Sequence, residues 1–195
     1  MALIFKSKNN IMIVLKILWK VFKVLSLIVG VLVVLVLILG LFAKKNMQAD
    51  KEIVINKPKA VVYDYIKLLK NQNEYSKWAS MDANMKKNFN GTDGTVGFIS
   101  AWDGNSDVGK GEQEIKKIEG DRIDYELRFE KPFKATNTAY MAVKALTDST
   151  TKVTWGFAGK MNYPLNAMSI FIDMGKKVGD DFGTGLINLK NILEK

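Results

Sequence analysis

The chain has 195 residues, carries a net charge of +9 and contains neither histidine nor cysteine. The lack of imidazole and thiol groups excludes Ser-His-Asp and Cys-His nucleophilic systems, disulfides and the usual zinc sites, and we expect no metal and no cofactor. Five lysines and no acidic residue lie in the first 43 residues, so the remainder carries only +4, scattered among acidic neighbours, and we expect no nucleic-acid partner.

A run of twenty residues without a charge extends from Val24 to Ala43. As a helix rising about 1.5 Å per residue, it would be roughly 30 Å long, which matches the hydrocarbon core of a bilayer. A surface helix of a soluble domain keeps one polar face, and this run has none. We predict a transmembrane span at about 24–43, within an anchor region of residues 1–43. The alternative, a cleaved signal peptide, usually has a shorter apolar core and a small-x-small cleavage site, where this chain has Leu41-Phe42-Ala43.

Lysines are unequally distributed around this run. Five precede it, whereas Lys44 and Lys45 after it are soon joined by Asp50 and Glu52. Because the flank richer in lysine stays in the cytoplasm, we predict a single-pass protein of the cell membrane, with a cytoplasmic N-terminus and an extracytoplasmic C-terminal domain. The preceding lysines are Lys6, Lys8, Lys16, Lys20 and Lys23.

After the span we predict a short linker over residues 44–50 and one domain over residues 51–195. The domain begins with the strand Glu52–Asn56, and Pro58 then suits the first turn of a helix. Apolar residues at helical spacing continue this helix to Asn71, and a second short helix follows. The strands predicted next are Met85–Phe89, Val96–Trp102, Lys110–Glu119, Arg122–Glu130, Thr136–Leu146 and Thr151–Phe157.

Strict alternation marks the strand Arg122–Glu130. Its apolar residues lie at every second position, and charged residues lie between them. This period of two predicts an antiparallel sheet with one apolar and one solvated face. The apolar residues are Ile123, Tyr125, Leu127 and Phe129.

The tail from Leu165 to Leu193 has apolar residues every three or four positions, which predicts a long helix. Gly175, Gly179 and Gly183 lie four apart on it, although each costs about 1 kcal/mol relative to alanine. Either a sheet backbone or a ligand lies close to this stripe, or the helix is broken near Gly179. One helix cannot fill the concave apolar face of such a sheet, so we predict a cavity between them.

Short stretches of the domain follow one another in a characteristic order and spacing. They are Ile55–Ile66, Tyr75–Trp78, Gly94–Gly97, Trp102–Asn105, Val108–Gly111, Asp121–Tyr125, Lys152–Trp155 and the final helix. Together they resemble the START-like superfamily, also called SRPBCC, and within it the bacterial polyketide cyclase/dehydrase-like proteins. The resemblance covers about residues 50–194. It departs from the family pattern at Tyr75, where relatives often carry tryptophan.

The resemblance implies a helix-grip fold of the α+β class. In that fold a seven-stranded antiparallel sheet wraps a long C-terminal helix, two short helices close one end, and a cavity holds an apolar ligand. The membrane anchor lies outside the region of resemblance, although membrane-tethered relatives exist.

Aromatic side chains are the candidates to line this cavity, and each also has the simpler interpretation of a core residue. Asp173 is the weak catalytic candidate, because burial in the cavity would raise its pKa and suit it to acid or base chemistry. Its alternative role is a helix-surface carboxylate near Lys176 or Lys177. The ligand-binding candidates are Trp78, Trp102, Tyr125, Phe129, Tyr140, Trp155 and Phe171.

Three functions remain open. The missing catalytic side chains favour a membrane-tethered carrier or sensor that binds a hydrophobic small molecule or lipid, with the bilayer as its second partner. The second is a cyclase, dehydratase or hydrolase that uses Asp173 with Tyr125 or Tyr140 as proton donor. The third is a protein-interaction domain whose own aromatic residues fill the cavity, which a volume below about 300 Å³ would favour. No particular protein partner is predicted.

Overall fold

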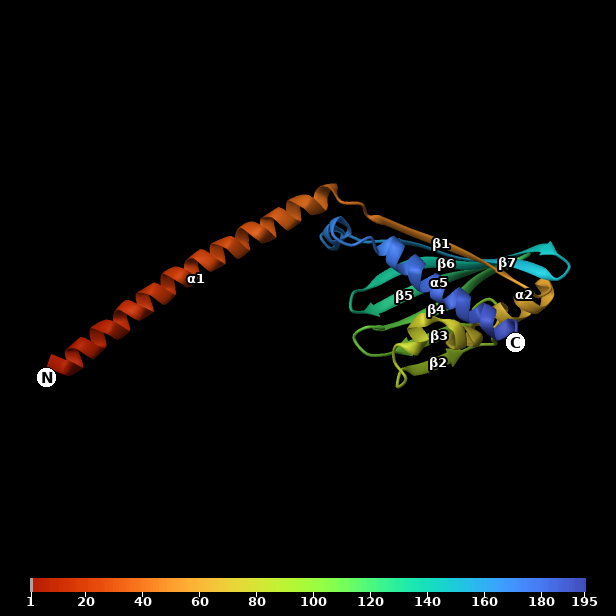
Figure 1. Ribbon diagram of the computed structural model, residues 1–195, viewed down its shortest axis with the longest axis horizontal. Coiled ribbons are helices and arrows are strands. Elements are labelled where there is room, and N and C mark those ends of the chain that lie inside the picture. The colour runs from red at the N-terminus through yellow and green to blue at the C-terminus, as the bar shows by residue number, and fades with distance from the viewer. Residues whose placement is uncertain (1) are drawn as a thin grey trace.

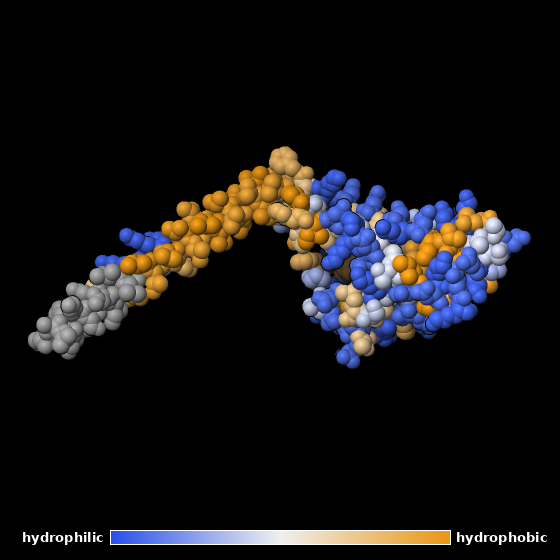
Figure 2. Space-filling model, viewed as in Figure 1, coloured by the Kyte–Doolittle hydropathy of each residue, from blue (hydrophilic) through white to orange (hydrophobic). Residues whose placement is uncertain are grey.

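The computed structural model describes residues 2–195, with side chains described at Met12 and from Leu15 onward. Helix α1, Ala2–Phe42, extends away from the domain as one rod (Figure 1). Within the described residues it is the one helix long and apolar enough to cross a membrane, over Leu15–Phe42. Figure 2 shows apolar surface on the part of this helix nearer the domain, and the side chains from Val24 to Val36 are exposed. Such a helix has no polar face to present to water.

Seven strands form one antiparallel sheet in the order β1-β7-β6-β5-β4-β3-β2. The prediction of a seven-stranded sheet is confirmed, and the limits of β4 and β5 agree with it to within one residue. The strands are β1 Asn46–Ile55, β2 Lys86–Asn90, β3 Ile99–Asp103, β4 Lys110–Glu119, β5 Arg122–Lys131, β6 Ala135–Thr147 and β7 Thr150–Lys160.

Strand β1 is longer than the sequence indicated. It begins at Asn46, which pairs with Lys160 at the end of β7. The connection between α1 and β1 is therefore only Ala43–Lys45, and most of the predicted linker is strand. In its first half, exposed polar residues alternate with Met47 and Ala49, which point toward the domain interior. The sequence alone did not reveal this alternation, because most of these residues are polar.

Four short helical segments follow β1, of which α2 lies at the end of the sheet away from α1 (Figure 1) and α4 packs against the last helix. They are α2 Lys59–Lys67, the 3-10 helix η1 Leu69–Asn71, α3 Gln72–Tyr75 and α4 Lys77–Ser80. The Tyr75 side chain is buried, and its main-chain carbonyl accepts a hydrogen bond of 3.1 Å from the Asn188 side chain. Lys77 Nζ lies 2.5 Å from a carboxylate oxygen of Asp181, which joins α4 to the last helix.

Helix α5, Met174–Leu193, lies across the concave face of the sheet (Figure 1) and buries Phe182, Leu186 and Leu189. It continues through Gly179 without a break. A Cβ atom at Gly175 would lie 2.6 Å from the carbonyl oxygen of Gln48, so the glycine stripe is explained at this position by close approach of the β1 backbone.

The interruption of the predicted helical tail lies elsewhere. Residues Leu165–Ile170 form a separate 3-10 helix, η2, and the chain then turns at Phe171 and Ile172. The Asp173 side chain caps the N-terminus of α5 by accepting a 2.9 Å hydrogen bond from Lys176 N. A carboxylate at this position also interacts favourably with the helix dipole, which accounts for a helix start here rather than at Leu165.

Candidate ligand cavity between the sheet and the last helix

A cavity of about 380 Å³ lies between the concave face of the sheet, the first half of α5 and the short helices. Small-molecule sites in proteins commonly occupy about 300–1,000 Å³ and are lined mainly by apolar side chains with a few polar groups. This cavity has that composition. Its walls include Trp78 and Ala79 from α4, Leu127 and Phe129 from β5, and Met174, Val178 and Phe182 from α5.

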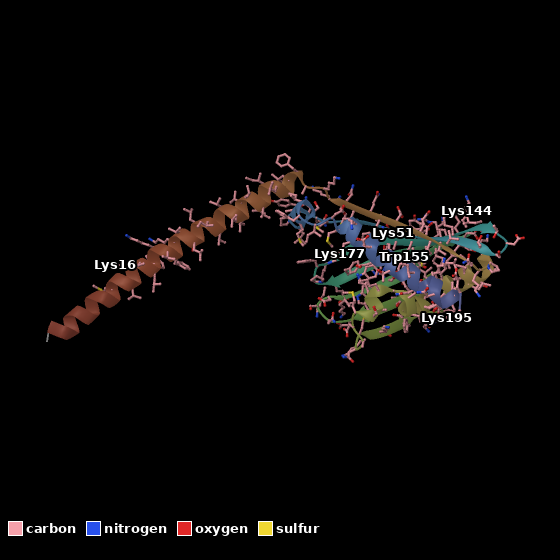
Figure 3. All side chains as sticks on the ribbon, in the orientation of Figure 1. Lys16, Lys51, Lys144, Trp155, Lys177 and Lys195 are labelled. Atoms are coloured by element: carbon pink, nitrogen blue, oxygen red, sulfur yellow. The ribbon has the colours of Figure 1, made fainter. Side chains whose placement is uncertain are left out.

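An aromatic cluster forms the wall nearest the domain centre. The rings of Trp155 and Phe182 stack at 4.4 Å between centroids with an interplanar angle of 13°. Trp78 meets the Phe182 ring edge-on at 5.6 Å, and Tyr75 meets Trp155 in the same way. Trp155 is on β7 and Phe182 is on α5, so this stack joins the sheet to the helix at the place where Figure 3 labels Trp155. Such aromatic pairs add roughly 0.5–1.5 kcal/mol each beyond their buried area, so they stabilise this wall.

Trp102 and Phe129 form an opposite wall, with ring centroids 5.7 Å apart and nearly perpendicular planes. Trp102 pairs in register with Gly111 on β4. A Cβ atom at Gly111 would lie 2.8 Å from the Trp102 ring, so only glycine leaves room for the indole to lie over the strand. Packing of the Trp102 ring therefore explains why residue 111 is a glycine.

Two hydrogen-bond donors in the cavity wall are buried without partners in the described part of the chain. They are the indole Nε1 of Trp102 and the amide Nε2 of Gln113, which is only 8% exposed. Both side chains lie on the concave face, since Gln113 pairs with Ser100 and Trp102 is two residues further along β3. A buried donor without a partner costs about 1–3 kcal/mol. An acceptor brought by a ligand would remove that cost.

The open end of the cavity faces the anchor. The exposed residues in its lining are Lys87, Asp107, Lys131 and Pro132. Lys87 lies near the start of β2, Lys131 ends β5, and the other two lie in the loops after β3 and β5. These positions share one end of the sheet with the Asn46–Lys160 pair. In Figure 1 this end of the sheet is turned toward α1.

Four of the seven predicted ligand-binding residues line the cavity: Trp78, Trp102, Phe129 and Trp155. Tyr125 points inward but lies in the closed core with Val62 and Ile66, outside the cavity lining. Burial raises the pKa of its hydroxyl. Tyr125 is thus a core residue in this structure.

Tyr140 and Phe171 lie away from the cavity. Tyr140 is on the opposite face of the sheet, where its hydroxyl donates a 2.8 Å hydrogen bond to Asp50 and the Arg122 guanidinium covers its ring. Its neighbours Ala139 and Met141 take the inward positions of β6, as the period of two requires. Phe171 is 73% exposed and lies beside α1, because it follows η2 instead of belonging to α5.

Asp173 is exposed and caps α5, so the structure does not place it in the cavity as an acid or base. The carboxylate that is nearly buried is Asp181, which pairs with Lys77. Among the described residues, no three acidic side chains are grouped so that they would hold a metal ion.

Sequence reasoning missed several cavity residues, although signals for them existed. Gln113 falls at an inward position of β4 between Gly111 and Ile115, and Phe182 lies on the apolar stripe of the last helix. Met47 was missed because the start of β1 was placed too late.

Comparisons with known proteins identify the fold. No family model and no curated protein matches the chain. Among solved structures, Ara h 8.0201 is similar over 76% of this chain and 97% of its own, at 12% identity and a TM-score of 0.53. A hypothetical protein of Helicobacter pylori is similar over 74% and 86%, at 10% identity and a TM-score of 0.56.

The protein TTHA0849 of Thermus thermophilus is similar over 75% of this chain and 96% of its own, at 14% identity and a TM-score of 0.55. At such identities the similarity concerns the fold alone. The domain therefore has a helix-grip fold, a seven-stranded antiparallel sheet with a long C-terminal helix and short helices, preceded by an apolar N-terminal helix.

Proposed function

We propose that this chain is a membrane-tethered binding protein of the START-like/SRPBCC type, a carrier or sensor for a hydrophobic small molecule or lipid. The observation that carries the proposal is the cavity of about 380 Å³ with aromatic walls. This volume exceeds the lower limit of roughly 300 Å³ for ordinary ligand sites. It therefore favours a ligand carrier over a protein-interaction domain whose cavity is filled.

The two buried donors specify part of the ligand. From the same wall, Trp102 Nε1 can donate one hydrogen bond and Gln113 Nε2 can donate up to two. A ligand with an apolar body and a carbonyl, carboxylate or hydroxyl oxygen would satisfy them, while its apolar part contacts the aromatic cluster around Trp155. Apolar contact supplies affinity and the few polar groups fix orientation in such sites.

Helix α1 supports the proposed tether. Its apolar part has the length of a bilayer core, and the lysines before it favour a cytoplasmic N-terminus. Cleavage as a signal peptide is disfavoured by the contacts of its last turns, because the buried Asn166 side chain donates hydrogen bonds to the carbonyls of Gly40 and Ala43. Removal of α1 would leave that buried amide without partners.

The positions of the three candidate catalytic side chains do not support the enzymatic alternative. Asp173 is exposed, Tyr140 lies on the outer face of the sheet, and Tyr125 is in the closed core. The cavity lining has one carboxylate, Asp107, which is exposed at the open end. We therefore propose binding without chemical conversion.

A cavity-filling variant tests the proposal. Val178 lies on α5, is partly exposed and lines the cavity, so Val178→Trp should occupy the space and leave the core packed. We expect its affinity for a dansyl-labelled fatty acid to fall by tenfold or more, measured by fluorescence titration of the full chain in detergent. Ile187→Trp, at an exposed position of the same helix, is the control and should bind as the wild type does. Equal affinity in all three proteins would contradict a ligand in this cavity.

A further inference from the structure

A short segment between β7 and α5 packs against the end of α1. We call residues Met161–Asp173, which contain η2, the docking segment. Its Asn166 side chain is fully buried and donates hydrogen bonds of 2.6 Å to Gly40 O and 3.1 Å to Ala43 O. Ser169 Oγ donates to Lys44 O at 3.1 Å. These donors satisfy one carbonyl in the last turn of α1, which has no partner within the helix, and two carbonyls of the connection that follows it.

The docking segment and α1 enclose a second groove, of about 410 Å³, that is lined by apolar residues. From α1 it includes Val29, Leu32, Val33, Val36 and Leu37, and from the segment it includes Leu165, Met168 and Phe171. Val36 is seven residues before Ala43, so it lies about 10 Å below the end of the span at about 1.5 Å per residue. One wall of the groove is thus at the depth of the acyl chains if α1 spans the membrane.

The docking segment also exposes a cluster of large apolar side chains. Phe171 is 73% exposed, and Tyr163, Met168, Ile170 and Ile172 are exposed as well. Figure 2 shows the apolar surface of α1 continuing onto the part of the domain beneath its C-terminal end. A continuous apolar surface of this kind marks an interaction site, and its continuity with the span indicates lipid as the partner.

The backbone of the docking segment is suited to contact with lipid. Polar main-chain groups without partners are costly in lipid. In η2 and its turn, Ala167 N donates to Pro164 O, and both Phe171 N and Ile172 N donate to Met168 O, at 2.9–3.1 Å. Lysines flank the segment at Lys44, Lys45, Lys160 and Lys177, where they can meet anionic headgroups.

We propose that the docking segment is a second membrane contact of this protein, which inserts Phe171 and Met168 at the boundary between headgroups and acyl chains, with an acyl chain in the groove beside α1. The proposal rests on the proposed membrane tether. It orients the domain so that the open end of the ligand cavity faces the bilayer, because Met174 lines the cavity and follows Phe171 by three residues. Ligand then passes between lipid and cavity beside the start of α5.

Single spin labels test this directly, since the chain has no native cysteine. Three variants of the full chain, Phe171→Cys, Leu32→Cys and Ser149→Cys, are labelled with a nitroxide and placed in vesicles of phosphatidylcholine and phosphatidylglycerol. Leu32 is in the span, and Ser149 is exposed in the β6–β7 turn at the other end of the sheet. Collision with oxygen and with a water-soluble nickel complex reports the depth of each label by power-saturation EPR.

The expected result is a deep label at residue 32, an aqueous label at 149, and a label at 171 near the headgroup boundary, with Met168→Cys behaving like Phe171→Cys. A label at 171 as aqueous as that at 149, beside a deep label at 32, would overturn the second contact and leave the tether intact. Aqueous labels at both 32 and 171 would overturn the tether itself. A label at 171 that neither reagent reaches would show a protein partner on this surface, which also overturns the proposal.

Discussion

The side-chain amide of Asn166 donates a hydrogen bond to the main-chain carbonyl of Gly40, 126 positions earlier in the sequence. The contact joins the last turn of the apolar helix to η2, which precedes α5. Tyr163 packs on the same turn, and a Cβ atom at Gly40 would lie 3.2 Å from its ring. The domain and its anchor therefore meet through packed contacts and not only through the three-residue connection Ala43–Lys45.

Replacement of Asn166 should release the docking segment. In Asn166→Leu the carbonyls of Gly40 and Ala43 lose their donor, and we expect a loss of about 1–3 kcal/mol in the local stability of residues 161–173. Hydrogen exchange of the full chain in detergent measures this as faster exchange at Ala167, Phe171 and Ile172. Asn162→Leu, at an exposed position, is the control. Unchanged exchange in Asn166→Leu would mean that the contact does not hold the segment.

Two glycines of α5 should respond to alanine with opposite signs. At Gly175 a Cβ atom would lie 2.6 Å from Gln48 O, so Gly175→Ala must move α5 away from β1 and should destabilise the domain by about 1–3 kcal/mol. At Gly183 a Cβ atom meets nothing within 4 Å, so Gly183→Ala should stabilise the domain by up to about 1 kcal/mol. Urea unfolding followed by circular dichroism measures both. Changes of the same sign would refute the proposed close approach.

The buried donor of Gln113 should affect stability and binding in opposite directions. Because its Nε2 has no partner in the described residues, Gln113→Met should leave the melting temperature unchanged or raise it. The same change should weaken binding of a fatty acid by about two- to tenfold, which corresponds to one hydrogen bond of about 0.5–1.5 kcal/mol. A matched hydrocarbon without an acceptor group is the control ligand, and its affinity should not fall. Equal losses for both ligands would assign Gln113 a packing role only.

An ion-pair network on the outer face of the sheet should make stability depend on pH. A hydrogen bond from Arg128 and a weaker effect of one from Lys116 lower the pKa of Glu114 below its ordinary value of 4.5. Arg128 also contacts Glu112 and Glu126. A carboxyl with a lowered pKa in the folded state stabilises that state above its unfolded pKa. The stabilisation is lost as the pH falls through the lower folded value.

The melting temperature of the wild type should therefore fall more steeply than that of Glu114→Gln, which lacks the titrating group, as the pH drops below about 4.5. The exposed Glu119→Gln controls for the replacement of any strand glutamate. Parallel melting curves for the wild type and Glu114→Gln across this range would show that the network contributes nothing measurable.

Alternation and turn residues were sufficient to predict most of the sheet. Strands β4 to β7 follow from the period of two, and the same period, applied to β6, would have placed Tyr140 outside, since Ala139 and Met141 are its inward neighbours. The start of β1 could not be read because Asn46, Gln48 and Asp50 are polar, and their strand conformation depends on pairing with β7, which is distant in sequence.

The interruption of the helical tail before α5 could not be predicted from the sequence either. Phe171 fits the apolar period of the last helix, yet the Asp173 cap starts the helix after it, and Phe171 lies next to α1 instead. The cavity was predicted from the shape of the fold, whereas its polar wall was not. Whether Trp102 and Gln113 find partners depends on their tertiary neighbours, which residue spacing does not contain.

The central claim is that the cavity between the sheet and α5 holds an apolar ligand. Native mass spectrometry of the full chain, purified from membranes in mild detergent, tests it most directly, with Val178→Trp measured in parallel. We predict a bound molecule that is released on activation in the gas phase, exchanges for an added fatty acid, and is reduced or absent in Val178→Trp. The claim would be contradicted if, in repeated preparations, the wild type carried no ligand and took up no added fatty acid, and so behaved like Val178→Trp.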